Sequence, residues 1–259
     1  MGVLHLNYTK LKDEKGFTHN SLSKKDFQSF NSSILGLGDI SRDGTNIQAL
    51  AAIFDLENFT SFFNQPDPHI VVPEYLSIFL DWLFKEISNK FKKDDENEKI
   101  TIWGSLPFFA KFLGDGILFI WDTSYSMGVS GIGNIIITLR NICVEYVLDL
   151  LPIVRRKATK IPLRLRCGIA RGQIMSIGNG QDFVGPCINI ASRLQKISQL
   201  SFAFSSRGVD IENGMSAANR ELFILKKMKV RGIGDELIYF DKSEFESLSY
   251  KEKKLFVEP

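Results

Sequence analysis

Apolar residues recur along the chain at two spacings, and these spacings predict its strands and helices. Residues 49–54 form an apolar run that stops at Asp55, which is typical of a buried strand that leads into a turn. Residues 72–91 place apolar side chains every three or four positions, which predicts an amphipathic helix. The charged linker that follows, residues 92–99, is predicted to be solvated surface.

The centre of the chain combines short β-like segments with one long helix. Residues 100–103, 108–112 and 117–121 are rich in β-branched and aromatic side chains, which favours strands. Gly114-Asp115-Gly116 supplies a turn between the last two, so a β-hairpin is predicted there. A long helix is predicted over residues 132–154.

The second half of the chain continues to alternate strands with helices. Strands are predicted over residues 163–170, 173–177, 228–231 and 236–240, with Gly172 separating the first two, and a helix over residues 186–197. Strands that alternate with helices but are joined by hairpins predict an α+β, ferredoxin-like fold, with a central, mostly antiparallel sheet flanked by helices. We expect an N-terminal extension over residues 1–45, a main domain over residues 46–242 and a C-terminal tail over residues 243–259.

Composition and charge exclude several classes of protein. The net charge of +2, from 32 basic and 30 acidic side chains, gives no global field that would mark a binder of nucleic acid or membranes. Cys143, Cys167 and Cys187 are odd in number and lack paired spacing, which favours reduced thiols over a disulfide or zinc framework. The chain begins without the pattern of a secretory signal, and charges interrupt residues 132–154, so we expect a cytoplasmic protein without a membrane span.

Two carboxylates and one polar helix face are the candidates for chemistry. Asp55 and Asp115 stand at strand ends beside turns, where a single aspartate is more often a cap or a turn former. Asn189 and Arg193 are four residues apart on a helix that starts near Pro186, so they share one face beside apolar residues. Polar side chains beside apolar, core-facing residues are expected to bind a polar partner.

Taken together, these segments resemble the class III adenylyl and guanylyl cyclases, whose catalytic domains carry three motifs in this order. The motifs match, in turn, Asp55 to Thr60, Lys111 with Gly114-Asp115, and Asp182 with Asn189 and Arg193. The resemblance covers residues 47–241. The joint occurrence of the motifs in order is far more specific than any one of them.

The resemblance implies a site for two metal ions. Asp55, Asp115 and the backbone carbonyl of Leu56 would hold two Mg²⁺ or Mn²⁺ ions, since hard cations prefer oxygen ligands. The ribose 3′-hydroxyl would then attack the α-phosphorus, and pyrophosphate would leave. The phosphates would be bound by the loop that follows Leu56, at Asn58, Phe59 and Thr60. Many relatives have glycine at the position of Asn58, and asparagine is the next most tolerant residue for a left-handed turn.

The resemblance also implies roles for four polar side chains in binding the ribose and the phosphates. Arg193 would stabilise charge on the α-phosphate, and Asn189 would position the ribose. Arg166 would contact the terminal phosphates, and Arg231 matches the first lysine of a late Lys-Gly-Lys-Gly segment, whose second lysine is Ile233 here. A solvated surface arginine is the alternative for Arg231. In this family one subunit supplies the aspartates and the other supplies the asparagine and arginine, so a homodimer would form two composite sites.

Lys111 and Asp182 match the pair of residues that reads the base. A lysine donor and an aspartate acceptor suit adenine and cytosine, and they also suit uracil through O4 and N3–H. Pocket size must therefore decide between the bases. By family match the pocket positions are Ile53, Leu113, Phe183 and Ile188, and many relatives carry a smaller residue at the position of Phe183.

Residues 34–40, 64–73 and 79–84 resemble the bacterial pyrimidine cyclases of Pycsar anti-phage defence. That subgroup implies synthesis of cyclic UMP, our first choice, or cyclic CMP, which a separately encoded effector protein would sense. The alternatives are an ordinary adenylyl cyclase, an inactive nucleotide-binding regulatory module and a ferredoxin-like RNA-binding domain. His69 lies in a turn typical of a helix start and is assigned no catalytic role.

Overall fold

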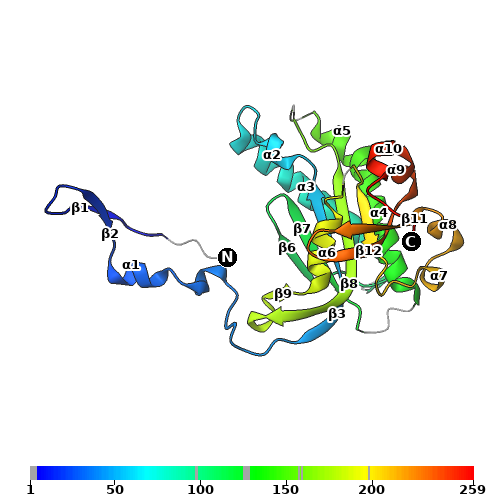
Figure 1. Cartoon of the computed structure of the whole chain (residues 1–259), viewed down its shortest axis with the longest axis horizontal. Helices are drawn as coiled ribbons and strands as arrows, with labels where there is room; N and C mark the ends of the chain where they lie inside the picture. The colour runs from blue at the N-terminus through cyan, green and yellow to red at the C-terminus, as the bar shows by residue number, and fades with distance from the viewer. Residues whose placement is uncertain (1–4, 97–98, 125–128, 157, 159, 198) are drawn as a thin grey trace. The chain divides into compact units, whose positions relative to one another are not determined.

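The computed structural model describes residues 5–96, 99–124, 129–156, 158, 160–197 and 199–259. The chain divides into two compact units (Figure 1). The smaller unit comprises Met1–Asn46 and Met175–Val184, and the larger unit comprises Ile47–Ile174 and Gly185–Pro259.

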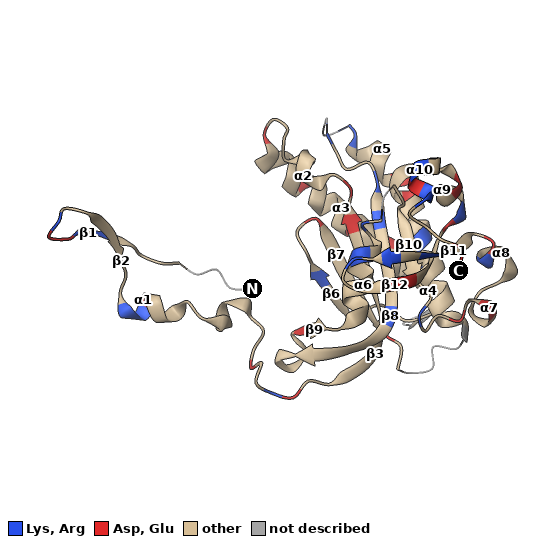
Figure 2. Ribbon diagram, in the orientation of Figure 1, with Lys and Arg blue, Asp and Glu red and all other residues tan. Residues whose placement is uncertain are grey.

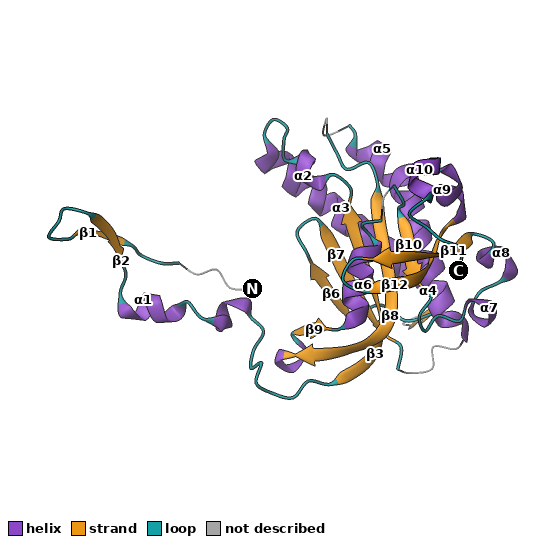
Figure 3. Ribbon diagram, in the orientation of Figure 1, coloured by secondary structure: helices purple, strands orange, loops and turns teal. Residues whose placement is uncertain are grey.

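A mixed β-sheet forms the framework of the larger unit. Its strands are β3 (Asn46–Leu56), β6 (Phe109–Phe112), β7 (Gly116–Asp122), β8 (Leu165–Ile177), β10 (Phe202–Ser205), β11 (Phe223–Val230) and β12 (Gly234–Asp241). They lie in the order β11-β12-β10-β8-β3-β7-β6 (Figure 3). The β10–β8 pair is parallel, whereas the β11–β12, β12–β10, β3–β7 and β7–β6 pairs are antiparallel. The predicted α+β class with a mostly antiparallel sheet is confirmed, and so is the hairpin around Gly114-Asp115-Gly116.

Helices cover both faces of this sheet. α3 (Pro68–Phe91) and α4 (Val129–Glu145) share one hydrophobic core with alternate residues of β3, such as Leu50, Ala52 and Phe54. Because side chains alternate along a strand, the residues between them face the opposite side. α6 (Pro186–Leu194) packs on that opposite side, close against Gly168 of β8.

The long helix predicted over residues 132–154 is interrupted. It consists of α4, a π-helical turn (η2, Tyr146–Leu150) and α5 (Leu151–Val154). Pro152 has no N–H to donate to a carbonyl one turn earlier, which accounts for the widened turn that precedes it. The shorter helices of the larger unit are α2 (Phe59–Phe62), α7 (Ile211–Gly214), α8 (Ala217–Arg220), α9 (Lys242–Ser247) and α10 (Tyr250–Lys253).

Several predicted boundaries differ from those in the structure. β8 continues through Gly172 as one strand, because a glycine can adopt extended backbone without ending the pairing. The charged linker is not simply loop, since β4 (Lys92–Glu96) pairs antiparallel with β5 (Lys99–Ile102). β5 therefore pairs with the linker and not with the main sheet. α3 starts earlier than predicted, and α6 ends earlier.

The C-terminal residues pack onto the larger unit. Phe245, Leu248 and Phe256 are buried, and Val257 pairs with Lys227 of β11. Acidic and basic positions are interspersed over the elements of this unit (Figure 2). Within the part of the chain that the structure describes, none of the helices combines the length and apolar character needed to cross a membrane.

The smaller unit contains short elements that the sequence pattern did not predict. They are the hairpin of β1 (Thr9–Lys12) and β2 (Thr18–Ser21), helix α1 (Lys24–Ser29), two 3-10 turns (η1, Ser32–Leu35, and η3, Gly178–Gly180) and β9 (Asp182–Val184). β9 pairs with the last residues of β8, from Met175 to Ile177. From His5 to Gln48 no residue is buried. This lack of burial explains why the extension has no clear hydrophobic period.

Candidate active site

Asp55 and Asp115 lie at the same end of two neighbouring strands. Asp55 is opposite Gly116 in the β3–β7 pair, and the Leu56 N–H donates to the Asp115 carbonyl oxygen at 3.0 Å. A Cβ atom on Gly116 would lie 2.2 Å from the Phe54 carbonyl oxygen, so only glycine permits this approach. The two aspartates predicted to bind metal are thereby brought together.

The Asp55 carboxylate is buried, with 4% of the residue exposed, and it pairs with Arg166 of β8. The Arg166 Nε donates to Asp55 Oδ2 at 3.0 Å, and Nη2 donates to the same oxygen. Burial raises the pKa of Asp55; Arg166 lowers it, and the charge of Asp115 raises it. Lys196, which follows α6, also lowers the pKa of Asp55. The sequence analysis missed Lys196, because no motif includes it.

The oxygen atoms around Asp55 fit a divalent cation. Within the described ranges no group of three or more His, Cys, Asp and Glu residues could hold a metal ion. The site instead offers two carboxylates and the Leu56 carbonyl, which are hard oxygen donors of the kind that Mg²⁺ and Mn²⁺ bind. The two neighbouring negative charges repel each other, and a bound cation would relieve that repulsion.

Two of the predicted base-binding residues share one face of the sheet. Leu118 of β7 is opposite Ile53 on β3 and opposite Lys111 on β6. Cross-strand partners point to the same face and neighbouring strands are about 4.8 Å apart, so Ile53 and Lys111 flank Leu118 roughly 10 Å from each other. Leu113 follows β6, and its N–H donates to the Gly116 carbonyl oxygen at 2.8 Å.

The predicted phosphate loop makes a left-handed turn at Asn58. Its φ of 60° and ψ of 25° confirm that asparagine adopts the conformation for which glycine is usually chosen. Phe59 is buried and anchors the single turn of α2, whereas Thr60 is exposed.

Asn189 and Arg193 lie on the exposed face of α6. The helix buries Cys187, Ile190, Ala191 and Leu194. Ile188 is half-buried. Across the described residues, no hydrogen bond or ion pair links Asn189 or Arg193 to Asp55 or Asp115.

The remaining predicted site residues lie on separate elements of the two units. Asp182 and Phe183 belong to the smaller unit, where the Phe183 N–H donates to Asp182 Oδ1 at 2.9 Å and the Phe183 side chain is buried. Arg231 is exposed and lies in the turn between β11 and β12, outside either strand. A base pocket that includes Asp182 and Phe183 stays a prediction.

Comparison with known proteins identifies the fold. No family model and no curated protein matches the sequence. The structure is similar to the adenylyl cyclase CyaB from P. aeruginosa, with a TM-score of 0.50 and 17% identity over 77% of this chain and 96% of that chain. It is also similar to the catalytic core of a rhodopsin-guanylyl cyclase with converted specificity, in complex with ATPαS. That match has a TM-score of 0.51 and 16% identity over 77% of this chain and 98% of the other. This is the class III cyclase fold. At such identities the likeness concerns the fold alone.

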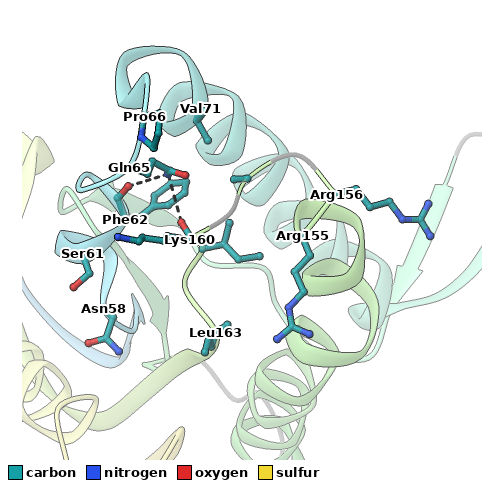
Figure 4. A pocket seen from close by; sticks show the side chains of 12 residues that line it. Asn58, Ser61, Phe62, Gln65, Pro66, Val71, Arg155, Arg156, Lys160 and Leu163 are labelled. Atoms are coloured by element: carbon teal, nitrogen blue, oxygen red, sulfur yellow. Dashed lines mark hydrogen bonds between the residues drawn. The ribbon is translucent and has the colours of Figure 1, made fainter.

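A cavity of about 840 Å³ lies beside the loop at Asn58 that is predicted to bind phosphate (Figure 4). The Lys160 side chain points toward Phe62 and Gln65, and Gln65 Nε2 donates to the Phe62 carbonyl oxygen at 2.8 Å. The cavity is lined by Asn58, Ser61, Phe62, Gln65, Pro66, Val71, Arg155, Arg156, Ala158, Lys160, Ile161 and Leu163. Its basic side chains belong to no motif, so the sequence analysis did not find them.

Proposed function

We propose that the chain is a nucleotidyl cyclase that converts a pyrimidine nucleoside triphosphate, UTP first, into a 3′,5′-cyclic monophosphate and pyrophosphate. One observation carries the proposal. Asp55 and Asp115 lie together at one end of the neighbouring strands β3 and β7, and Asp55 pairs with Arg166, in a chain with the class III cyclase fold.

In this proposal the sheet end holds the reacting groups. Asp55, Asp115 and the Leu56 carbonyl hold two Mg²⁺ or Mn²⁺ ions, which when bound supply Lewis-acid activation of the ribose 3′-hydroxyl and charge neutralisation of the triphosphate. The backbone of the phosphate loop, at Asn58, Phe59 and Thr60, binds the phosphates. Arg166 leaves Asp55 and contacts the terminal phosphates, and Arg231 is the candidate for a second contact.

The proposed active enzyme is a homodimer with composite sites. Arg193 stabilises the charge that develops on the α-phosphate, and Asn189 orients the ribose. Both side chains are exposed on α6, and the described part of the same chain offers no direct contact from either to Asp55. This exposure supports their use by a second copy of the chain, across a twofold axis.

The choice of base rests on the resemblance to the pyrimidine cyclases. Lys111 and Asp182 read the base, and the pocket is completed by Ile53, Leu113, Phe183 and Ile188. CTP is the nearest alternative. ATP is the other, because Lys111 and Asp182 also suit adenine and one similar structure is an adenylyl cyclase. The product is proposed to act in anti-phage defence through a separate effector protein that senses the cyclic nucleotide.

The purified protein incubated with Mn²⁺ and ATP, GTP, CTP or UTP separately tests the activity and the base together. Mass spectrometry of the products should detect cyclic UMP, or cyclic CMP as the alternative. Asp115→Asn is the matched inactive variant, because it keeps the side-chain shape and removes the charge. Cyclic AMP alone would replace the pyrimidine proposal by an adenylyl cyclase. The absence of any cyclic product would favour the inactive regulatory module.

A further inference from the structure

Arg164 and Glu57 are joined by both their side chains and their main chains. Arg164 directly precedes β8, and its Nε and Nη2 donate to Glu57 Oε2 and Oε1 at 2.6 and 2.7 Å. The Glu57 N–H donates to the Arg164 carbonyl oxygen at 3.1 Å. A two-pronged guanidinium–carboxylate pair restricts orientation as well as distance, which a single hydrogen bond does not.

The guanidinium of Arg164 is also held from its other side. Its Nη2 donates to Gln199 Oε1 at 2.8 Å, and its Nη1 donates to the Gln199 carbonyl oxygen. The side chains of Arg164 and Glu57 are only 29% and 15% exposed. A fixed, half-buried arginine is a more rigid anchor than a solvated surface ion pair, which contributes little.

Glu57 lies in the segment on which the proposed chemistry depends. It follows Leu56, whose N–H is bound to the Asp115 carbonyl oxygen, and it precedes the left-handed turn at Asn58. The turn is therefore held on the β7 side through Asp115 and on the β8 side through Arg164.

We infer that Arg164 is a positioning residue that acts through Glu57. It fixes where the chain leaves β3, so that the Leu56 carbonyl and the amides from Asn58 to Thr60 point into the site for metal and triphosphate, while the Glu57 amide stays bound to the Arg164 carbonyl oxygen. Arg164 lies outside every motif of the cyclase resemblance, and the motif that spans Asp55 to Thr60 assigns no role to the Glu57 side chain. The inference rests on the proposed function, in which the Leu56 carbonyl binds metal and the loop amides bind phosphate.

The test compares Arg164→Ala, Glu57→Gln and the double variant with the wild-type protein. Glu57→Gln keeps the side-chain shape and so tests the same contact if Arg164→Ala does not fold. The control is Lys90→Ala. It removes an ion pair of similar exposure between Lys90 and Glu145, 2.6 Å apart, at the far end of α3. A helix of 24 residues places that end about 35 Å from its start.

The first readout is calorimetric binding of inorganic tripolyphosphate with Mn²⁺, which probes the metal and phosphate contacts without a base. We expect Arg164→Ala and Glu57→Gln to weaken this binding by about 10- to 100-fold, the usual effect of removing a group that orients a ligand-bearing residue. The double variant should be no weaker than Arg164→Ala, because both changes remove one interaction. Lys90→Ala should bind like wild type. The second readout is cyclisation, where kcat should fall in the two single variants.

Wild-type binding of tripolyphosphate by folded Arg164→Ala would overturn the inference, and so would losses that add in the double variant. Wild-type protein that does not bind the probe would overturn it as well. Failure of the proposed function looks different: wild-type protein would make no cyclic nucleotide, yet the binding loss in Arg164→Ala would remain and support the inference.

Discussion

Gly168 lies at a close approach of β8 to α6, and replacing it tests how tightly the strand and the helix must pack. A Cβ atom at this position would lie 2.2 Å from the Ala191 carbonyl oxygen and 2.4 Å from the Gln195 nitrogen, both backbone atoms. Because ordinary contacts are near 3.5 Å, α6 must retreat by about 1 Å in Gly168→Ala. Overpacking of this kind costs about 1–3 kcal/mol, and a shift of about 1 Å in a catalytic group can cost about 100-fold in rate.

Gly172 provides the matched control on the same strand. Gly172 lies four residues after Gly168 on β8, so both glycines face the same side of the sheet. A Cβ atom added to Gly172 would lie 3.4 Å from the Cys187 Cβ, which is an ordinary contact. Gly172→Ala should be neutral or more stable by roughly 0.5–1 kcal/mol, since it removes backbone freedom from the unfolded chain. Urea unfolding measures the stability change, and cyclisation measures the displacement of Arg193. Equal stability and activity in Gly168→Ala and Gly172→Ala would refute the packing argument.

Three further predictions concern the site and its surroundings. Mixing inactive Asp55→Ala and Arg193→Ala chains should restore about a quarter of the wild-type activity, because half of the dimers would then hold one intact composite site; unchanged inactivity after subunit exchange argues against shared sites. Burial raises the pKa of Cys187 to about 11, so iodoacetamide at pH 7.5 should label this thiol only after unfolding, and labelling of the native protein should increase as the pH rises toward 11. Asn58→Gly should retain activity, whereas Asn58→Val should lose about 1–2 kcal/mol of stability in urea unfolding, because a β-branched residue resists the left-handed turn; equal stability of these two variants would contradict that account.

The core strands and the hairpin were predictable because their hydrophobic periods are strong. The run that leads to Asp55 and the turn at Gly114-Asp115-Gly116 both form where the pattern indicates. The widened helical turn before Pro152 was not predicted. The spacing of apolar residues predicts a helix but does not show where a proline lacks the backbone N–H that the helix needs. The strand predicted over residues 100–103 is present as β5, but its partner β4 was not predicted, since a charged sequence can pair through its backbone alone.

Among the site residues, those in short local motifs were predictable from the sequence, whereas contacts between distant parts of the chain were not. The two aspartates proposed to bind metal could be selected from the sequence because each lies in a short local motif. The ion pair of Asp55 with Arg166 and that of Glu57 with Arg164 join residues more than a hundred positions apart, separated by 111 and 107 residues. Such pairing depends on strand order, which a single sequence does not encode in any local pattern.

The pairing of Arg166 with Asp55 implies thermodynamic coupling between the two halves of the proposed substrate complex. A cation that binds Asp55 must compete with an internal guanidinium that already neutralises it. A triphosphate that attracts Arg166 removes that competitor, so each ligand raises the affinity for the other by the same factor. With the proposed roles of Arg166 and Asp55, the nucleotide-free protein is expected to bind cations more weakly than the nucleotide complex does.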